Sequence, residues 1–168
     1  MAERNPNLIS PKAMEAMAST ANSGRELYSE IFTKINNAKD KPKKIEVLRR
    51  YNTPNMRMVL KGAFDPKIEW ELPPGIPPYI ANEAPAGTEH TYLELEAKRL
   101  YNFVKGGNNQ LNKIRKETLF IQMLEGLHAD EAKILIDMKN KTLNKTYKGL
   151  TSEMVKEAFG WNADFVKP

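Results

Sequence analysis

The feature that most constrains the fold of this chain is a proline cluster in its middle. The stretch WELPPGIPPYI, residues 70–80, places four prolines within six residues. Proline fixes φ and has no backbone N–H, so neither a helix nor a central strand can continue through it. Just before the prolines, Ile68, Trp70 and Leu72 alternate with glutamates, which is typical of an extended segment with one buried face. We therefore expect residues 65–90 to form an extended strap.

Helix signals dominate on both sides of this strap. Before it, the Thr53–Pro54 pair is a cap followed by a first-turn proline. After it, the TYLE sequence at Thr91 has the form of a capping box, and the longest apolar helical pattern runs from Gln110 to Leu127. These signals predict a mainly α fold: a bundle of short helices in two lobes joined by the proline-rich strap, with little or no sheet. The expected parts are a flexible N-terminal arm at 1–22, an N-terminal helical lobe at 23–64, the strap at 65–90 and a C-terminal helical lobe at 91–168.

The strap has two interpretations. Pro74 and Pro77 form a P-x-x-P motif, of the kind that docks on aromatic grooves of other proteins. A free ligand loop, however, would hardly leave large apolar side chains in water. The strap carries five of them, those of Trp70, Leu72, Ile76, Tyr79 and Ile80. We expect the strap to pack on the chain's own helices, with Trp70, Pro74, Pro77 and Tyr79 as candidate protein-binding residues.

The net charge of +5 comes from one stretch of the chain. Between Lys34 and Arg57 there are eight basic residues and two acidic ones. Such clusters are typical of proteins with anionic partners, although a solvated or protein-facing surface gives the same pattern. No known RNA- or DNA-binding motif accompanies the cluster. The candidate nucleic-acid-binding residues are Lys41, Lys43, Lys44, Arg49 and Arg50.

The sequence contains no recognisable catalytic or metal-binding motif. Without cysteine there is no disulfide, no thiolate nucleophile and no sulfur-ligated zinc, and the two histidines, His90 and His128, lack metal-ligand spacing. We therefore predict no enzymatic activity, no metal and no cofactor. The first twenty residues lack the apolar stretch of a signal peptide, and no apolar run is long enough for a membrane span. We expect a cytoplasmic protein without a membrane partner.

Three segments carry a resemblance to a known family: YNTPNMRMVLKGAFDPKIEWELPPGIPPY, ETLFIQMLEGLHADEAKILIDMKNK and YKGLTSEMVKEAFG. From about Arg50 onward, the chain resembles a small family of uncharacterised proteins encoded by T4-like tailed phages, including those of marine cyanobacteria. The first 35 residues and the loop around Asn144 do not contribute. The resemblance implies a phage gene expressed in the cytoplasm of a bacterial host. It assigns no functional residue.

Three functions follow as hypotheses. The first is a non-enzymatic phage accessory protein that binds a host or phage protein through its helical faces and its strap. The second is a nucleic-acid-binding factor in phage replication or transcription, based on the basic stretch. The third is a minor virion component, which would place the protein in the particle rather than only in the host cytoplasm.

Overall fold

Helices make up most of the chain, and the proline-rich segment runs between them. The computed structural model describes residues 26–83 and 91–168; the predicted N-terminal arm at 1–22 lies outside these residues. Within the described ranges there are eight α-helices, one 3-10 helix and no strand, so the predicted mainly α fold is confirmed. None of these helices is both long enough and apolar enough to cross a membrane.

The helices fall into two groups along the chain. Before the strap come α2 (Tyr28–Asn37), α3 (Lys41–Arg50) and α4 (Pro54–Phe64). After it come α5 (Leu93–Glu96), the 3-10 helix η1 (Ala97–Phe103), α6 (Lys113–Gly126), α7 (Ala129–Asn140), α8 (Leu143–Thr146) and α9 (Ser152–Phe159). Helix α6, with 14 residues, lies where the sequence has its longest apolar pattern.

Local capping residues set several helix ends, and the one at Thr53 lies where the sequence predicts it. The Thr53 side chain accepts a hydrogen bond from the backbone N–H of Met56, and Thr151 caps α9 in the same way through the N–H of Met154. Gly160 ends α9 in the left-handed conformation, with φ of 68°, which glycine adopts without a steric cost. These ends therefore need no tertiary partner to define them.

The predicted capping box at Thr91 is wrong. Helix α5 has no side-chain hydrogen bond at its own N-cap residue. Instead, the buried carboxylate of Glu131 on α7 accepts the N–H of Leu93 (2.9 Å) and the N–H of Tyr28 at the start of α2 (2.6 Å). The carboxylate of Glu94, the other half of the expected box, accepts a hydrogen bond from the Tyr28 hydroxyl (2.5 Å). Tertiary contacts replace the local one, and one buried carboxylate caps two helices.

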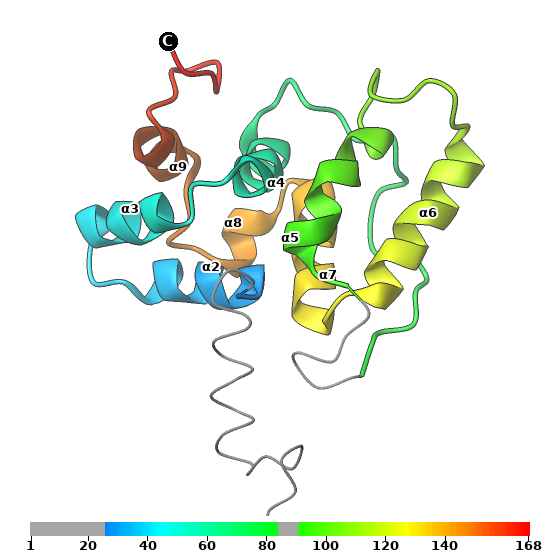
Figure 1. Ribbon diagram of the computed structural model, residues 1–168, viewed down its shortest axis with the longest axis horizontal. Helices are drawn as coiled ribbons and strands as arrows, with labels where there is room; N and C mark the ends of the chain where they lie inside the picture. The colour runs from blue at the N-terminus through cyan, green and yellow to red at the C-terminus, as the bar shows by residue number, and fades with distance from the viewer. Residues whose placement is uncertain (1–25, 84–90) are drawn as a thin grey trace, which may run out of the picture.

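Both groups of helices bury their apolar faces in one hydrophobic cluster. Helix α3 packs on α9, and α4 packs on α7, so each of these pairs has one helix from before the strap and one from after it. Figure 1 shows α9 beside α3. Leu48 of α3, Leu60 of α4 and Leu135 of α7 are fully buried in this cluster. The residues of the predicted lobes at 23–64 and 91–168 therefore share a core.

The strap, described over residues 65–83, runs along α6 (Figure 1). Trp70 pairs with Val104 in an isolated antiparallel bridge, flanked by two backbone hydrogen bonds of 2.7 and 2.8 Å. Trp70, Leu72 and Tyr79 pack against the hydrophobic cluster, as predicted. The strap is thus packed on a cluster that contains residues from helices before it and after it in the chain.

The expectation that Ile76 and Ile80 also pack inward is wrong: their exposed fractions are 78% and 79%. Before the prolines, the half-buried apolar side chains are those of Ile68, Trp70 and Leu72. After Gly75, the half-buried positions are Pro77 and Tyr79. This alternation changes phase across the Pro73–Gly75 turn, where Gly75 has a φ of 85°. The positive φ at Gly75 therefore turns both isoleucines outward.

Candidate binding surface

The strap presents an apolar face to solvent. We call the exposed residues Pro74, Ile76, Pro78 and Ile80 the outer strap face. Isolated exposed apolar side chains are common on proteins, but here two isoleucines and two prolines occupy one short extended segment. Exposed apolar side chains so close together along the chain are suited to contact with another protein.

The backbone of the strap is fixed by side chains from α6 and α7. The ammonium of Lys139, a residue with an exposed fraction of only 8%, donates hydrogen bonds to the carbonyl oxygens of Pro73 (2.8 Å) and Gly75 (2.7 Å). Its burial lowers the pKa of Lys139. Further along, the N–H of Ile80 donates to a carboxylate oxygen of Glu125 (2.8 Å). The outer strap face is therefore presented on a preorganised backbone, which lowers the entropic cost of binding.

Trp70 anchors the start of the strap. Its indole N–H donates to the carbonyl oxygen of Gly62 on α4 (3.0 Å), and its ring lies over that glycine. Among the four candidate protein-binding residues from the sequence, Trp70 and Tyr79 face the core, Pro77 is half-buried and Pro74 is exposed. Sequence reasoning missed the two exposed isoleucines, because the phase change at the glycine between the proline pairs was not taken into account.

A second anchor joins the strap to α6. Lys116 is almost completely buried and forms an ion pair with Glu71. The hydrogen bond from the Lys116 ammonium lowers the pKa of Glu71. Of the two glutamates that alternate with Ile68, Trp70 and Leu72, Glu71 therefore has a structural role in the ion pair with Lys116.

Two of the candidate nucleic-acid-binding residues, Lys44 and Arg49, donate hydrogen bonds to backbone carbonyl oxygens at helix ends. The Lys44 ammonium donates to the carbonyl oxygens of Ile35 (3.1 Å), Asn36 (3.0 Å) and Ala38 (2.9 Å), and so caps the C-terminal end of α2. The guanidinium of Arg49 donates from Nε to the carbonyl oxygen of Ala158 (3.1 Å), at the end of α9. Cations at helix C-termini also interact favourably with the helix dipole.

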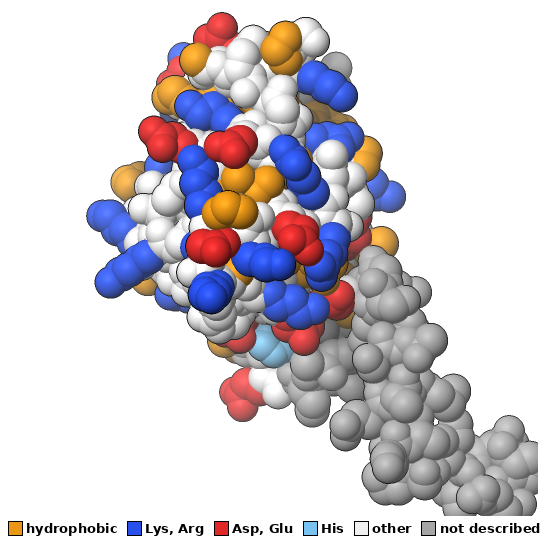
Figure 2. All heavy atoms as spheres, turned by 90° about the vertical axis from the view of Figure 1, so that its left-hand side faces the viewer, with side chains coloured by type: hydrophobic (Ala, Val, Ile, Leu, Met, Phe, Trp, Pro, Cys, Tyr) orange, Lys and Arg blue, Asp and Glu red, His pale blue; other side chains and the backbone are white. Residues whose placement is uncertain are grey.

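The other three candidates form exposed ion pairs. Lys43 and Arg50 both lie near Glu46, at 3.6 and 2.9 Å, and Lys41 lies 3.2 Å from Glu157. The hydrogen bond from Arg50 lowers the pKa of Glu46. Figure 2 views the molecule from the side of α3 and α9, and Lys and Arg side chains lie there among Asp and Glu side chains. The excess positive charge of the sequence stretch is thus interspersed with acidic groups in space.

A metal site in the described part of the chain would require several ligand side chains close together. No three His, Asp or Glu side chains there lie close enough together to hold a metal ion. His128 acts as the N-cap of α7, because its Nδ1 accepts the backbone N–H of Asp130 (3.1 Å). The structure thus gives this histidine a helix-capping role.

Comparison with known proteins places the chain in a family. A protein-family model described as "Family of unknown function (DUF6433)" matches residues 31–145, about two thirds of the chain. The chain belongs to the DUF6433 family. The matched region of this DUF6433 member contains the strap, its outer face and Lys139, whereas α9 lies beyond it. Comparisons with curated proteins and with solved structures give no match.

Proposed function

We propose that this DUF6433 protein is a non-enzymatic accessory protein of a tailed phage, and that it binds a host or phage protein through the outer strap face. The observation that carries the proposal is the exposure of Ile76 and Ile80 on a backbone held by Lys139 and Glu125. Extended proline-rich segments bind to apolar, aromatic-lined grooves because little conformational entropy remains to be lost. We therefore propose a partner with such a groove.

The phage origin and the host cytoplasm as the site of action are part of this proposal, and they are based on the sequence resemblance. The virion alternative uses the same surface with a structural protein of the particle as partner. Mass spectrometry of purified particles separates these two, because only a virion component co-purifies with the particles in a fixed ratio to the major structural proteins.

The nucleic-acid alternative has less support. Lys44 and Arg49 donate to helix carbonyl oxygens, and Lys41, Lys43 and Arg50 each pair with a carboxylate. A nucleic acid would have to displace those carboxylates to reach the three exposed cations. A steep fall of DNA or RNA affinity between low and moderate salt would nevertheless reveal such binding.

The test of the proposed function is affinity capture from nuclease-treated lysate of phage-infected cells, with the full-length chain and three single variants. Ile76→Asp and Ile80→Asp place a charge on the outer strap face, while Ile114→Asp places it on α6 at a matched exposed fraction of 78%. We expect wild type and Ile114→Asp to recover the same protein, and both strap variants to recover at least about tenfold less of it. Equal recovery by all three variants, or no specific protein with wild type, would refute the proposal.

A further inference from the structure

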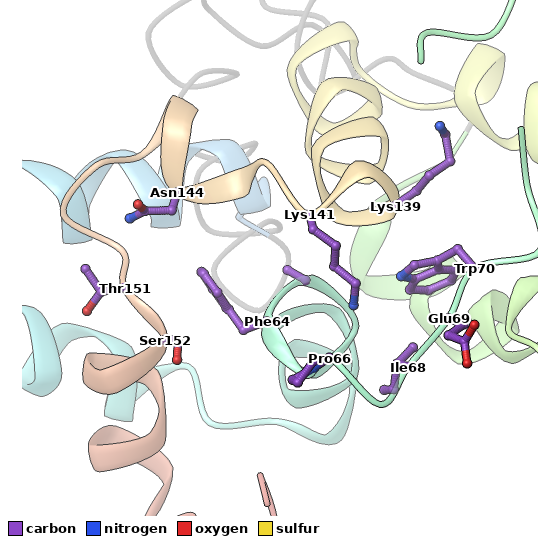
Figure 3. Close-up of a pocket in the computed structure, with 11 residues that line it drawn as sticks. Phe64, Pro66, Ile68, Glu69, Trp70, Lys139, Lys141, Asn144, Thr151 and Ser152 are labelled. Atoms are coloured by element: carbon purple, nitrogen blue, oxygen red, sulfur yellow. The ribbon is translucent and has the colours of Figure 1, made fainter. Parts of the chain in front are cut away.

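A groove of about 670 Å³ lies away from the outer strap face (Figure 3). It is formed by the end of α4, the first residues of the strap, the end of α7, α8 and the start of α9. Its volume is within the range of small-molecule binding sites. None of the outer strap residues lines it, so this groove is a separate feature of the surface.

The groove has an apolar end and a polar end. At the apolar end, Ile68 and Trp70 of the strap lie beside the charged Glu69 and Lys139; Phe64 of α4 lies on the other side of Lys141, toward Ser152 (Figure 3). At the polar end lie Asn144 and Ser152, from α8 and α9. A ligand that fills the groove would therefore place an apolar body against the strap and a polar group toward α9.

Lys141 projects between these two ends (Figure 3). Its ammonium donates to the carbonyl oxygens of Gly62 (2.6 Å) and Asp65 (3.0 Å), so among the described residues two of its three N–H groups are used and one remains for a ligand. Desolvation lowers the pKa of Lys141, and the charge of Asp65 opposes that shift. The described residues provide no carboxylate in ion-pair contact with this ammonium. Lys141 is exposed as a whole residue, but its ammonium keeps one N–H for a ligand and has no direct counter-ion among the described residues, which favours an anionic ligand.

We propose that this groove binds a small amphiphilic anion, with its apolar body over Ile68 and Trp70 and its acidic group hydrogen-bonded to Lys141. Glu69, the carboxylate among the lining residues, belongs to the strap end of the groove. It therefore directs an anionic head group toward Lys141 and Ser152 rather than toward the strap. The groove and the outer strap face share no residue, although Trp70 and Lys139, which hold the strap, also line the groove.

The test uses two fluorescent probes with the same aromatic body. 8-Anilinonaphthalene-1-sulfonate carries a sulfonate, and N-phenyl-1-naphthylamine does not. We expect the sulfonate probe to bind the folded wild-type chain at one site and at least about fivefold more tightly than the neutral probe, a difference of about 1 kcal/mol. Equal affinity of the two probes, or binding at many weak sites, would overturn the proposal.

Two matched variants of Ser152 locate the site without loss of the fold. Ser152→Asp adds a negative charge to the polar end of the groove, at the first position of α9, where an acidic residue favours the helix. Ser152→Asn changes the side chain without adding a charge. We expect the sulfonate probe to bind Ser152→Asp at least about threefold more weakly and Ser152→Asn as it binds wild type, with the neutral probe unaffected by either. An unchanged affinity of the sulfonate probe for Ser152→Asp would rule out this groove.

Displacement then identifies the kind of apolar body. Decanoate has a flexible alkyl chain and 2-naphthoate a flat aromatic ring, and both carry one carboxylate. Displacement of the bound sulfonate probe by either acid supports the proposal and assigns an aliphatic or an aromatic body. If neither acid displaces the probe at concentrations below its own aggregation limit, the groove does not recognise amphiphilic anions.

Discussion

At the scale of single residues, Gly62 has no room for a side chain. A Cβ atom there would lie 2.5 Å from Cζ2 of Trp70, which is closer than two non-bonded carbon atoms can approach each other. Alanine within a helix is intrinsically favoured over glycine by up to about 1 kcal/mol, but overpacking costs about 1–3 kcal/mol. We expect Gly62→Ala to lower the free energy of unfolding by about 1–2 kcal/mol and to displace the indole toward water. Urea unfolding and Trp70 emission, measured in a Trp161→Phe background, check both effects.

The matched control for that change is Lys61→Ala, one position earlier on α4. Lys61 is half-buried, and no hydrogen bond or ion pair of its side chain is found among the described residues, so the effect on the free energy of unfolding should stay within about 0.5 kcal/mol. A Gly62→Ala protein that is as stable as the control would show that the indole can move away without loss. The attachment of the strap to α4 would then be weaker than the structure indicates.

The hydroxyl of the half-buried Tyr147 makes the free energy of unfolding depend on pH in the alkaline range. Burial raises the pKa of Tyr147 to about 12, and the charges of Asp130, Asp137 and Glu131 add to the shift. Because this folded pKa is higher than the unfolded value of about 10, the contribution is complete below pH 10 and is lost as pH rises from 10 to 12. The free energy of unfolding should therefore fall over this range.

The matched variant is Tyr147→Phe, which keeps the edge-on ring contact with Phe32 (centroids 5.5 Å apart) but has no proton to lose. Other titrating groups are common to both proteins and cancel in the comparison. Between pH 9 and 11, we expect the loss of stability to be smaller in Tyr147→Phe by about 0.5–1 kcal/mol, after allowance for partial solvent exposure of the hydroxyl. Urea unfolding at pH 9, 10 and 11 gives the slopes; parallel slopes would contradict the assignment.

At the scale of elements, two of the five basic residues of α3, Lys44 and Lys43, separate a capping role from a surface role. Lys44→Met removes the ammonium that caps α2 and should lower the free energy of unfolding by about 1–2 kcal/mol. Lys43→Met removes only an exposed pair with Glu46 and should change it by less than about 0.5 kcal/mol. Thermal and urea unfolding of the two variants provide the comparison. Equal effects would mean that the contacts of Lys44 with three carbonyl oxygens contribute nothing measurable.

The same elements show what the sequence could and could not predict. The helix end at Thr53 follows from local chemistry and was predicted, and the ends of α9 at Thr151 and Gly160 are set by equally local chemistry. The start of α5 depends on Glu131, which is 38 residues away from Leu93, and no local pattern reports such a contact. The same holds for the candidate surface: the proline motif indicated the strap, but the outward turn of Ile76 and Ile80 depends on the φ of one glycine and on carbonyl oxygens bound by a distant lysine.

At the scale of the whole molecule, the shared core predicts a single unfolding transition. Leu48 and Leu135 come from the two predicted lobes, yet both are fully buried in one hydrophobic cluster, and α3–α9 and α4–α7 contacts join the two groups of helices. Small proteins with one core usually unfold in an all-or-none manner. Urea curves from far-ultraviolet circular dichroism and from tryptophan emission should therefore coincide.

Two core truncations test this cooperativity, one in each predicted lobe. Leu48→Ala and Leu135→Ala should each lower the free energy of unfolding by about 2–5 kcal/mol, the cost of a cavity at a fully buried leucine. In a single cooperative unit, each variant shifts the dichroism curve and the emission curve to the same new midpoint. If Leu48→Ala instead shifts the dichroism curve and the emission curve to different midpoints, the helices of residues 26–64 unfold separately. The division into two lobes would then describe folding units, even though the native helices share one core.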